Sequence, residues 1–315
     1  MSKNLKTNNL TSFTFILITK NRFDIVNNIN SFFNFSKVID IRVIIIDGNK
    51  SDKIDRLIAD NFEKNKKIKI IKQKKGKFVR ACIIGVSNLE TDFFTFAYDD
   101  DYISKDFYKL IECADKYNST VIGNGIVIPK GSEYNFQSLK EPKKINSSDV
   151  LKMYYNSKKI NNKYLPASPA CSVFKKDIIK EWKEEFKNIM REKIKFYYIL
   201  HKNIGQDLLL YLISCKESNF IYYFNQYTAQ FTSHQNSMSV KFGSSNLAVG
   251  YWLTKLHYIN KTKKKFKKNE FFLIKLNLVM RGLKIVINQM LNRNSFTRHS
   301  TPKIIRILLK MVIKN

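Results

Sequence analysis

Residues 95–102 read Thr95-Phe96-Ala97-Tyr98-Asp99-Asp100-Asp101-Tyr102, an apolar and aromatic run that ends in three consecutive carboxylates. The run, which begins at Phe93, has the length and composition of a buried β-strand. Adjacent acids repel one another, but a divalent cation among them makes the cluster favourable because hard cations take carboxylate oxygens as ligands. A solvated acidic turn is the alternative interpretation, since Asp is common where strands end.

The sequence around this run alternates between two kinds of segment. Strand composition is found at 13–18, 41–46, 68–71, 93–98 and 120–128, and helical spacing at 24–35, 53–62, 77–89 and 106–117. This order predicts an α/β fold with a mostly parallel sheet and right-handed crossovers. Parallel strands end at one edge of a sheet, so Thr19, Asp47 and Asp99, which follow three of these strands, are expected to lie close together.

Composition and missing motifs narrow the class of protein. The 315 residues are 44% hydrophobic, which predicts one large domain, alone or with an appendage. No Gly-x-Gly-x-x-Gly follows the first strand and no Gly-Lys-Ser/Thr loop is present, which disfavours a dinucleotide-binding Rossmann domain and a P-loop enzyme. The four cysteines form no Cys-x-x-Cys pair, so free thiols in a reducing cytoplasm fit better than zinc. Residues 1–11 are polar and lack the apolar core of a signal peptide.

The charge balance points to an anionic partner. The net charge is +30, with 56 basic residues against 26 acidic ones. Nucleic acid, an anionic membrane surface and phosphorylated substrates all fit this balance, as does a general bias of composition toward Lys and Asn. No recognisable nucleic-acid-binding signature accompanies the charge, so a nucleic-acid partner is not expected.

Three segments at the ends of predicted strands share a pattern of short motifs. They are Phe15-Ile16-Leu17-Ile18-Thr19-Lys20-Asn21-Arg22, Ile44-Ile45-Ile46-Asp47-Gly48-Asn49-Lys50-Ser51-Asp52 and Asp99-Asp100-Asp101. In this order they resemble family 2 glycosyltransferases of bacteria, which invert the sugar's configuration and have the GT-A fold. That family carries Thr-x-Asn-Arg after strand one, Asp-Gly-Ser after strand two and Asp-x-Asp after strand four. The resemblance covers about residues 13–240; Ile46 stands where the family usually has another acid, and the register within the triple aspartate stays open.

The resemblance implies a donor site. A nucleotide would lie across the strand ends, Asp47 would accept from its base, and Mg²⁺ or Mn²⁺ would bridge the diphosphate. Lys77 and Arg80 could face the base or the diphosphate, and the alternative is that they belong to an exposed basic helix face. The implied nucleotide-binding residues are Thr19, Asn21, Arg22, Asp47, Lys77, Arg80, Asp99 and Asp100, and the implied metal ligands are Asp101, Asp99 and His234.

Asp207 is the expected catalytic base. It opens an apolar helix, where an acid is ordinarily a capping residue. The resemblance implies instead that it removes the proton of an attacking sugar hydroxyl, which is a poor nucleophile by itself. Gln206 replaces the Glu that the family usually has before this Asp.

The middle of the chain is expected to recognise the acceptor. Residues 130–148 are predicted to form a loop, 148–156 a short helix, and 220–224 and 227–231 two strands. The resemblance makes the small-residue segment 165–174 the floor of an acceptor pocket, with a plain structural turn as the alternative.

The C-terminal part lies outside the resemblance, so domains are predicted at 1–244 and 245–315. Residues 261–268 read as a basic linker, and 271–291 and 301–315 as amphipathic basic helices too polar to span a membrane. Such helices suit the surface of an anionic bilayer, and packing on the catalytic domain is the alternative. The expected polar residues are Asn277, Arg281, Lys284 and Asn288 in the first helix and Lys303, Arg306, Lys310 and Lys314 in the second.

Together these features predict a metal-dependent inverting glycosyltransferase. It would move a sugar from a nucleotide-sugar donor to a hydroxyl of a glycan or lipid-linked acceptor in bacterial capsule or lipopolysaccharide synthesis, on the cytoplasmic face of the inner membrane. There are three alternatives: a nucleotidyltransferase of similar fold, a basic nucleic-acid-binding protein and an inactive GT-A scaffold. The first of these would normally carry a Gly-rich phosphate loop.

Overall fold

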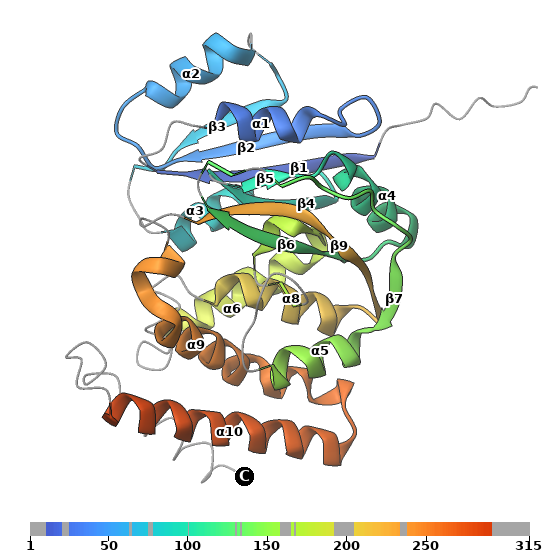
Figure 1. Ribbon diagram of the computed structural model, residues 1–315, viewed down its shortest axis with the longest axis vertical. Helices are drawn as coiled ribbons and strands as arrows, with labels where there is room; N and C mark the ends of the chain where they lie inside the picture. Colours follow the sequence, from blue (N-terminus) through green and yellow to red (C-terminus); the bar gives the residue numbers. More distant parts are fainter. Residues whose placement is uncertain are drawn as a thin grey trace, which may run out of the picture.

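The computed structural model describes residues 11–20, 25–62, 65–74, 78–99, 101–129, 131–132, 134–157, 165–166, 168–191, 205–233 and 238–291. Within these ranges one nine-stranded sheet has the order β3-β2-β1-β4-β8-β6-β9-β5, and β7 pairs with β9 (Figure 1). The strands are β1 Ser12–Thr19, β2 Asp40–Asp47, β3 Ile68–Lys72, β4 Phe93–Tyr98, β5 Asp101–Ile103, β6 Val121–Pro129, β7 Lys143–Asn146, β8 Ser172–Lys175 and β9 Phe220–Ser233.

The sheet has a parallel half and a mixed half. Strands β3, β2, β1 and β4 are all parallel, which confirms the predicted mostly parallel arrangement. Strand β8 then runs antiparallel to both β4 and β6, while β6 and β9 are parallel. Short strands β5 and β7 pair antiparallel with β9.

Helices cover both faces of the sheet (Figure 1). On one face α1, α2 and α4 pack over Phe13, Phe15 and Leu17 of β1. On the other, Ile16 belongs to a core shared with α3, α5, α6, α8, α9 and α10. The helices are α1 Val26–Phe33, α2 Lys53–Phe62, α3 Phe78–Ser87, α4 Tyr108–Tyr117, α5 Ser147–Asn156, α6 Ile179–Arg191, α8 Gln206–Glu217, α9 Met238–Tyr258 and α10 Lys268–Leu291.

Helix α8 lies at the centre of the helical layer. Residues Leu208–Ile213 are at most 1% exposed, so nearly every face of the helix is covered. A helix that is apolar all round is stable in water only when neighbours surround it. Helices α5, α6 and α9 provide this cover, and α10 packs in turn on α5 and α9.

Three local expectations differ from the structure. The predicted loop 130–148 contains β7, an edge strand whose Lys143 and Lys144 are compatible with an exposed position. The two strands expected at 220–224 and 227–231 are one strand, β9, because its pairing with β6 continues through an irregularity. The basic stretch expected as a linker is mostly a 3₁₀ helix, Ile259–Lys265, with Ile259 and Thr262 buried.

The predicted division at 244/245 falls inside α9, whose Val249, Trp252 and Leu253 are buried in the core shared with the sheet. The second predicted C-terminal helix, at 301–315, lies outside the described residues. None of the described helices has both the length and the apolar character required to cross a bilayer.

Candidate active site

The register of the parallel strands brings the predicted strand-end residues together. Thr19 is the partner of Asp47, and Asp47 is the partner of Lys72 on β3. Ile18 is the partner of Tyr98, so Asp99 follows at the level of Thr19. The strand pairing therefore places Thr19, Asp47 and Asp99 at one edge of the sheet, as expected.

Asp47 is fully buried and bonded within the protein. Its Oδ1 accepts from the backbone N–H of Asn49 at 2.8 Å and from the Asn49 side chain at 2.6 Å. Its Oδ2 accepts from Lys72 Nζ at 2.8 Å. These bonds shape the loop after β2. A further bond to a nucleotide base would use the remaining lone pairs of the carboxylate, and this role stays a prediction.

Lys72 is a residue that the sequence reasoning missed. Besides Asp47, its ammonium group contacts Asp55 at 2.6 Å and the carbonyl of Ser51 at 2.8 Å. Desolvation lowers the pKa of Lys72, but the hydrogen bonds that Lys72 donates to Asp47 and Asp55 outweigh it and raise the pKa above its usual value. The permanently charged lysine therefore fastens the loop after β2 to the end of β3.

The acidic turn between β4 and β5 is held from three sides. Thr19 Oγ1 donates to Asp99 Oδ2 at 3.0 Å, and the backbone N–H of Tyr98 donates to Asp101 Oδ2 at 2.9 Å. Asn28 of α1 donates its Nδ2 to the Asp101 carbonyl at 2.6 Å. Asp101 is only 2% exposed. One of its oxygens closes the turn, and its predicted contact with a metal stays a prediction.

Asp207 lies in the first turn of α8 and contacts the last residue of β4. Tyr98 donates its hydroxyl to Asp207 Oδ1 at 3.1 Å, which links the end of β4 to the start of α8. Phe78 of α3 packs on the Tyr98 ring, with 5.5 Å between the ring centres. Burial raises the pKa of Asp207 to about 7, although the bond from Tyr98 acts in the opposite direction.

Two further side chains lie in the electrostatic field of Asp207. Burial, and then the Asp207 charge, raise the pKa of Cys82 on α3 and of Tyr251 on α9. The pKa of Tyr98 is raised by the same two causes, so its phenol stays protonated and remains a donor. The carboxylate of Asp207 thus lies close to residues of α3, β4 and α9.

The segment predicted as an acceptor floor is a rigid support beneath β4. Thr95 of β4 donates to the carbonyl of Pro169 at 2.6 Å, and Tyr211 of α8 donates to the carbonyl of Ser168 at 2.7 Å. Tyr154 of α5 donates to the carbonyl of Pro166 at 2.8 Å. These bonds fix the segment to the elements that carry Tyr98 and Asp207, and its contact with an acceptor stays a prediction.

The remaining predicted residues are placed only in part. Arg80 lies exposed in the first turn of α3, which starts near the carboxyl end of β3. Among the described residues no group of three or more His, Cys, Asp or Glu side chains is arranged as a metal site. Five predicted residues lie outside the described ranges: Asn21, Arg22, Lys77, Asp100 and His234.

The donor set nevertheless suits a hard divalent cation. Mg²⁺ is commonly held by one or two carboxylates, with substrate phosphates and water completing the octahedron. Asp99 and Asp101 flank one turn, and their carboxylate oxygens are the kind of ligand that such a cation takes.

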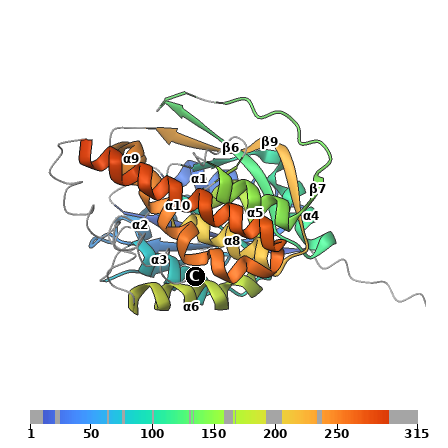
Figure 2. The ribbon, with the colours of Figure 1, turned by 90° about the horizontal axis from the view of Figure 1, so that it is seen from below.

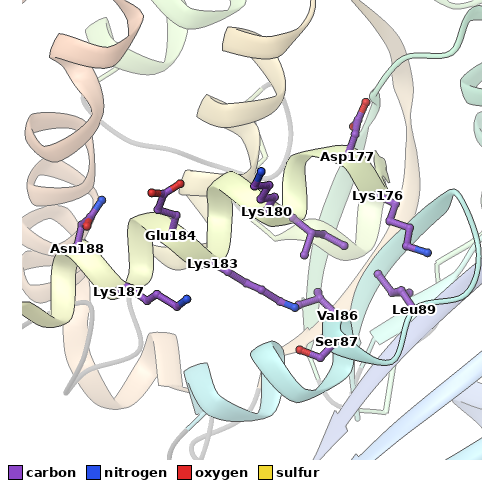
Figure 3. A pocket seen from close by; sticks show the side chains of 11 residues that line it. Val86, Ser87, Leu89, Lys176, Asp177, Lys180, Lys183, Glu184, Lys187 and Asn188 are labelled. Atoms are coloured by element: carbon purple, nitrogen blue, oxygen red, sulfur yellow. The ribbon is translucent and has the colours of Figure 1, made fainter.

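A pocket of about 780 Å³ lies elsewhere, between α3 and α6 (Figure 3). Its wall includes Val86, Ser87 and Leu89, which precede the first residue of β4 and therefore lie toward the opposite end of the strand from Tyr98. Lys183 extends from α6 toward Val86 and Ser87 (Figure 3). This pocket is separate from the cluster around Asp207.

Tyr98 and Lys72 carried weak signals in the sequence. Each is the last residue of its parallel strand, where side chains face the ligand edge. Lys72 could have been found by aligning the predicted end of strand three with Asp47. The partner of Tyr98 could not, because it sits more than a hundred residues away on a helix whose position the sequence leaves open.

Comparisons with known proteins agree with this architecture. The profile of the family described as "Glycosyl transferase family 2" matches residues 14–183. No curated protein sequence matches the chain.

Solved structures of S. aureus TarS share the fold. The TarS 1–349 complex with UDP-GlcNAc has a TM-score of 0.63 at 15% identity, covering 96% of this chain and 82% of that one. The complex of the same fragment with UDP has a TM-score of 0.55 at 15% identity, covering 86% and 70%. The longer TarS structure has a TM-score of 0.57 at 15% identity; the match covers 84% of this chain but only 42% of that one.

Proposed function

The chain belongs to glycosyltransferase family 2, and from this premise we propose that it is an inverting enzyme that moves a sugar from a nucleotide diphosphate to an acceptor hydroxyl. One observation carries the proposal: Asp207 is bonded to Tyr98, the residue next to Asp99, at the edge where Thr19 and Asp47 meet. A carboxylate suited to proton removal thus adjoins the side chains proposed to bind the donor.

In the proposed reaction the ionised Asp207 accepts the proton of the acceptor hydroxyl. The acceptor oxygen forms a bond to the anomeric carbon while the bond from that carbon to the diphosphate oxygen breaks, and the diphosphate leaves with the electron pair. Attack from the face opposite the leaving group inverts the configuration. A base with a pKa of about 7 is well matched to this task at neutral pH, since about half of it is ionised and the ionised form is still basic.

The donor is proposed to lie across the ends of β1, β2 and β4, with its base near Asp47 and its ribose near Asp99. Thr19, Asn21, Arg22, Lys77, Arg80 and Asp100 complete the proposed donor site. A uridine diphosphate sugar is the first candidate, because TarS, which shares the fold, forms a complex with UDP-GlcNAc.

We propose Mg²⁺ or Mn²⁺ as the cofactor, held by Asp99 and Asp101 with His234. When bound, the cation neutralises the charge that develops on the leaving diphosphate. The carboxylate donor set described above supports this assignment.

The acceptor is proposed to be a glycan or lipid-linked hydroxyl in bacterial surface polysaccharide synthesis, capsule or lipopolysaccharide, handled on the cytoplasmic face of the inner membrane. The basic composition of residues 261–315 supports a location at an anionic surface: it holds fifteen Lys and Arg residues and one acid, Glu270.

Asp207→Asn tests the catalytic proposal. Asn cannot take up the hydroxyl proton, and losing a general base typically slows a reaction by about 10²–10⁴-fold. We expect UDP release from a UDP-sugar, with Mn²⁺ and acceptor present, to fall by that factor. The rise in melting temperature that the donor causes should persist, since Asp207 is not proposed to hold the nucleotide.

Asp60→Asn, an exposed change on α2, is the matched control and should leave both readouts unchanged. Near-normal transfer by Asp207→Asn would remove Asp207 as the base. A wild-type melting temperature that no nucleotide sugar raises would contradict the donor site itself.

A further inference from the structure

Helix α10 is apolar on two opposite faces. Its inner face packs on α5 and α9, where Ile274 and Leu278 are at most 3% exposed and Trp252 of α9 donates to the Leu278 carbonyl at 2.8 Å. Its outer face carries six large apolar side chains that are highly exposed: Phe272 63%, Leu273 61%, Leu276 47%, Met280 57%, Leu283 43% and Ile287 54%.

These six residues form one continuous stripe, which we call the outer face of α10. At about 100° per residue they fall within an arc of about 100°, and at 1.5 Å per residue the stripe is about 22 Å long. Figure 2, which views the molecule from below, shows α10 crossing the near side of the helical layer. Contiguous exposed apolar surface of this kind marks a site of contact with a partner.

The surroundings of the outer face are basic. Lys268 and Lys284 are exposed on α10, and the preceding 3₁₀ helix exposes Lys263 and Lys264. The single acid of the helix, Glu270, is paired with Lys152 of α5 at 2.9 Å, so its charge is offset. An apolar stripe bordered by lysines matches a surface that is apolar inside and negative at its boundary.

We propose that the outer face of α10 is a membrane-contact surface that lies in the plane of an anionic bilayer. Phe272, Leu276 and Met280 would enter the boundary between headgroups and acyl chains, and the lysines would extend to the phosphates. Each lysine near such a surface strengthens binding to the anionic headgroups.

Charge also argues against the two protein occupants of this face. A second copy would bring the same lysines together across the contact, with no acid of α10 left to offset them. The chain's own residues 301–315 carry four basic residues and no acid, so folding back would add like charge to like charge. An anionic bilayer provides the opposite charge.

The contact would also orient the enzyme. The C-terminal end of α10 and the carboxyl ends of β1, β2 and β4 lie on the same side of the molecule (Figure 1). A bilayer against α10 would hold the molecule with its helical layer toward the membrane and the sheet on the far side of that layer (Figure 1). The membrane surface itself does not depend on the reaction proposed above, and binding can be measured without any turnover.

Vesicle flotation of the full chain tests the proposal. Wild type should float with phosphatidylcholine vesicles that contain phosphatidylglycerol, and much less with phosphatidylcholine alone. The double variant Leu276→Asp/Met280→Asp should lower the partition coefficient between vesicles and solution by at least about tenfold, because two inserted apolar groups become anionic. Val38→Asp/Val127→Asp is the control, with equal charge change at two exposed apolar positions elsewhere, 44% and 57% exposed.

Three outcomes would overturn the proposal. Equal flotation of the α10 variant and the control would exclude this face as the contact. A mass by light scattering that drops from dimer to monomer in the α10 variant, with vesicle binding unchanged, would assign the face to a second copy. If the wild type does not float, and deletion of residues 292–315 makes amide exchange in α10 faster, the face would be assigned to the chain's own C-terminal segment. Melting temperature confirms that each variant is folded.

Discussion

Asp207 combines two properties that a general base needs and that oppose each other. Burial among α3, β4, α8 and α9 makes its carboxylate basic, while the hydroxyl of Tyr98 fixes one oxygen and favours the ionised form. Without this burial the carboxylate would be a weak base. Without the bond from Tyr98 it would be mostly protonated at neutral pH. Tyr98 therefore sets the pH at which Asp207 becomes active, in addition to its orientation.

Tyr98→Phe should move the acidic limb of the pH profile of transfer to higher pH. Asp207 must be ionised to accept a proton, so wild-type activity should rise through a pH of about 7. Removing a hydrogen bond to a charged group costs about 1.5–3 kcal/mol, which corresponds to about one to two pH units. Initial rates of UDP release between pH 5.5 and 9.5 measure the shift, and full activity should return at high pH. A Tyr98→Phe profile that is lower at every pH but not displaced would mean that Tyr98 does not tune Asp207.

The sequence identified some of these residues and missed others for a physical reason. Asp47, Asp99 and Asp207 stand at the ends of elements, where a local pattern is enough to single out an acid. The contacts of Lys72 and Tyr98 depend on which strands are neighbours and on where α8 is placed. Local pattern does not determine these long-range arrangements. The burial of Asp101 was missed for the same reason, since it depends on the pairing of β5 with β9.

At the scale of elements, the start of α8 determines where Asp207 lies. Gly205 has φ +96°, which places the chain in the left-handed region just before the helix. A Cβ there would lie 2.1 Å from Thr254 Oγ1 and 3.0 Å from the Gly250 carbonyl, both on α9. Thr254 also donates to the Gly205 carbonyl at 3.3 Å. Close packing of α8 on α9 thus requires glycine two residues before the proposed base.

Gly205→Ala should lower both stability and transfer. We expect a loss of about 1–3 kcal/mol in the free energy of unfolding from backbone strain, with more from the clash with α9. Activity should fall as well, because a shift of Asp207 breaks its alignment with the acceptor. Urea denaturation and UDP release measure the two effects.

Gly131→Ala is the matched control for this variant. Gly131 has φ +87°, but a Cβ there meets nothing within 4 Å, so only backbone strain is added and activity should be retained. Equal losses in the two variants would show that packing of α8 on α9 contributes nothing beyond strain.

The elements themselves were predictable to different degrees. The strands at 13–18, 41–46, 68–71 and 93–98 agree with β1–β4. Strands β1, β2 and β4 are concentrated apolar runs that are largely buried on both faces, and the edge strand β3, which is only half-buried, is still rich in isoleucine. Strand β7 was missed because an edge strand with exposed lysines lacks that signal. The amphipathic pattern of α10 was recognised. The role of its Arg281 was not, because it donates to the Tyr155 carbonyl at the end of α5, a contact between distant segments.

At the scale of the whole molecule, two ionisable groups with shifted pKa values oppose each other in the pH dependence of stability. Asp207 has a raised pKa, so the folded state holds a proton that the unfolded chain releases, and stability falls as pH rises from about 4 to 7. Lys255 of α9 is 3% exposed, and burial followed by the nearby Arg281 charge lowers its pKa to about 7. Here the unfolded chain holds the extra proton above pH 7, so stability rises from there toward the pKa of an ordinary lysine near 10.5.

Lys255→Met should flatten the alkaline half of this curve. The wild-type free energy of unfolding should increase between pH 7.5 and 9.5 by about 1–2 kcal/mol more than that of the variant, because only the wild type sheds a proton on folding there. Urea denaturation at the two pH values measures the difference. Comparing the two pH values removes from the result the pH-independent cost of losing the bond from Lys255 to the Ser157 carbonyl at 3.1 Å. Lys284→Met, an exposed change on α10, should keep the wild-type slope. If wild type and Lys255→Met gain stability equally over this range, Lys255 is charged in the fold, and the packing of α9 and α10 on the end of α5 tolerates two adjacent cations without releasing a proton.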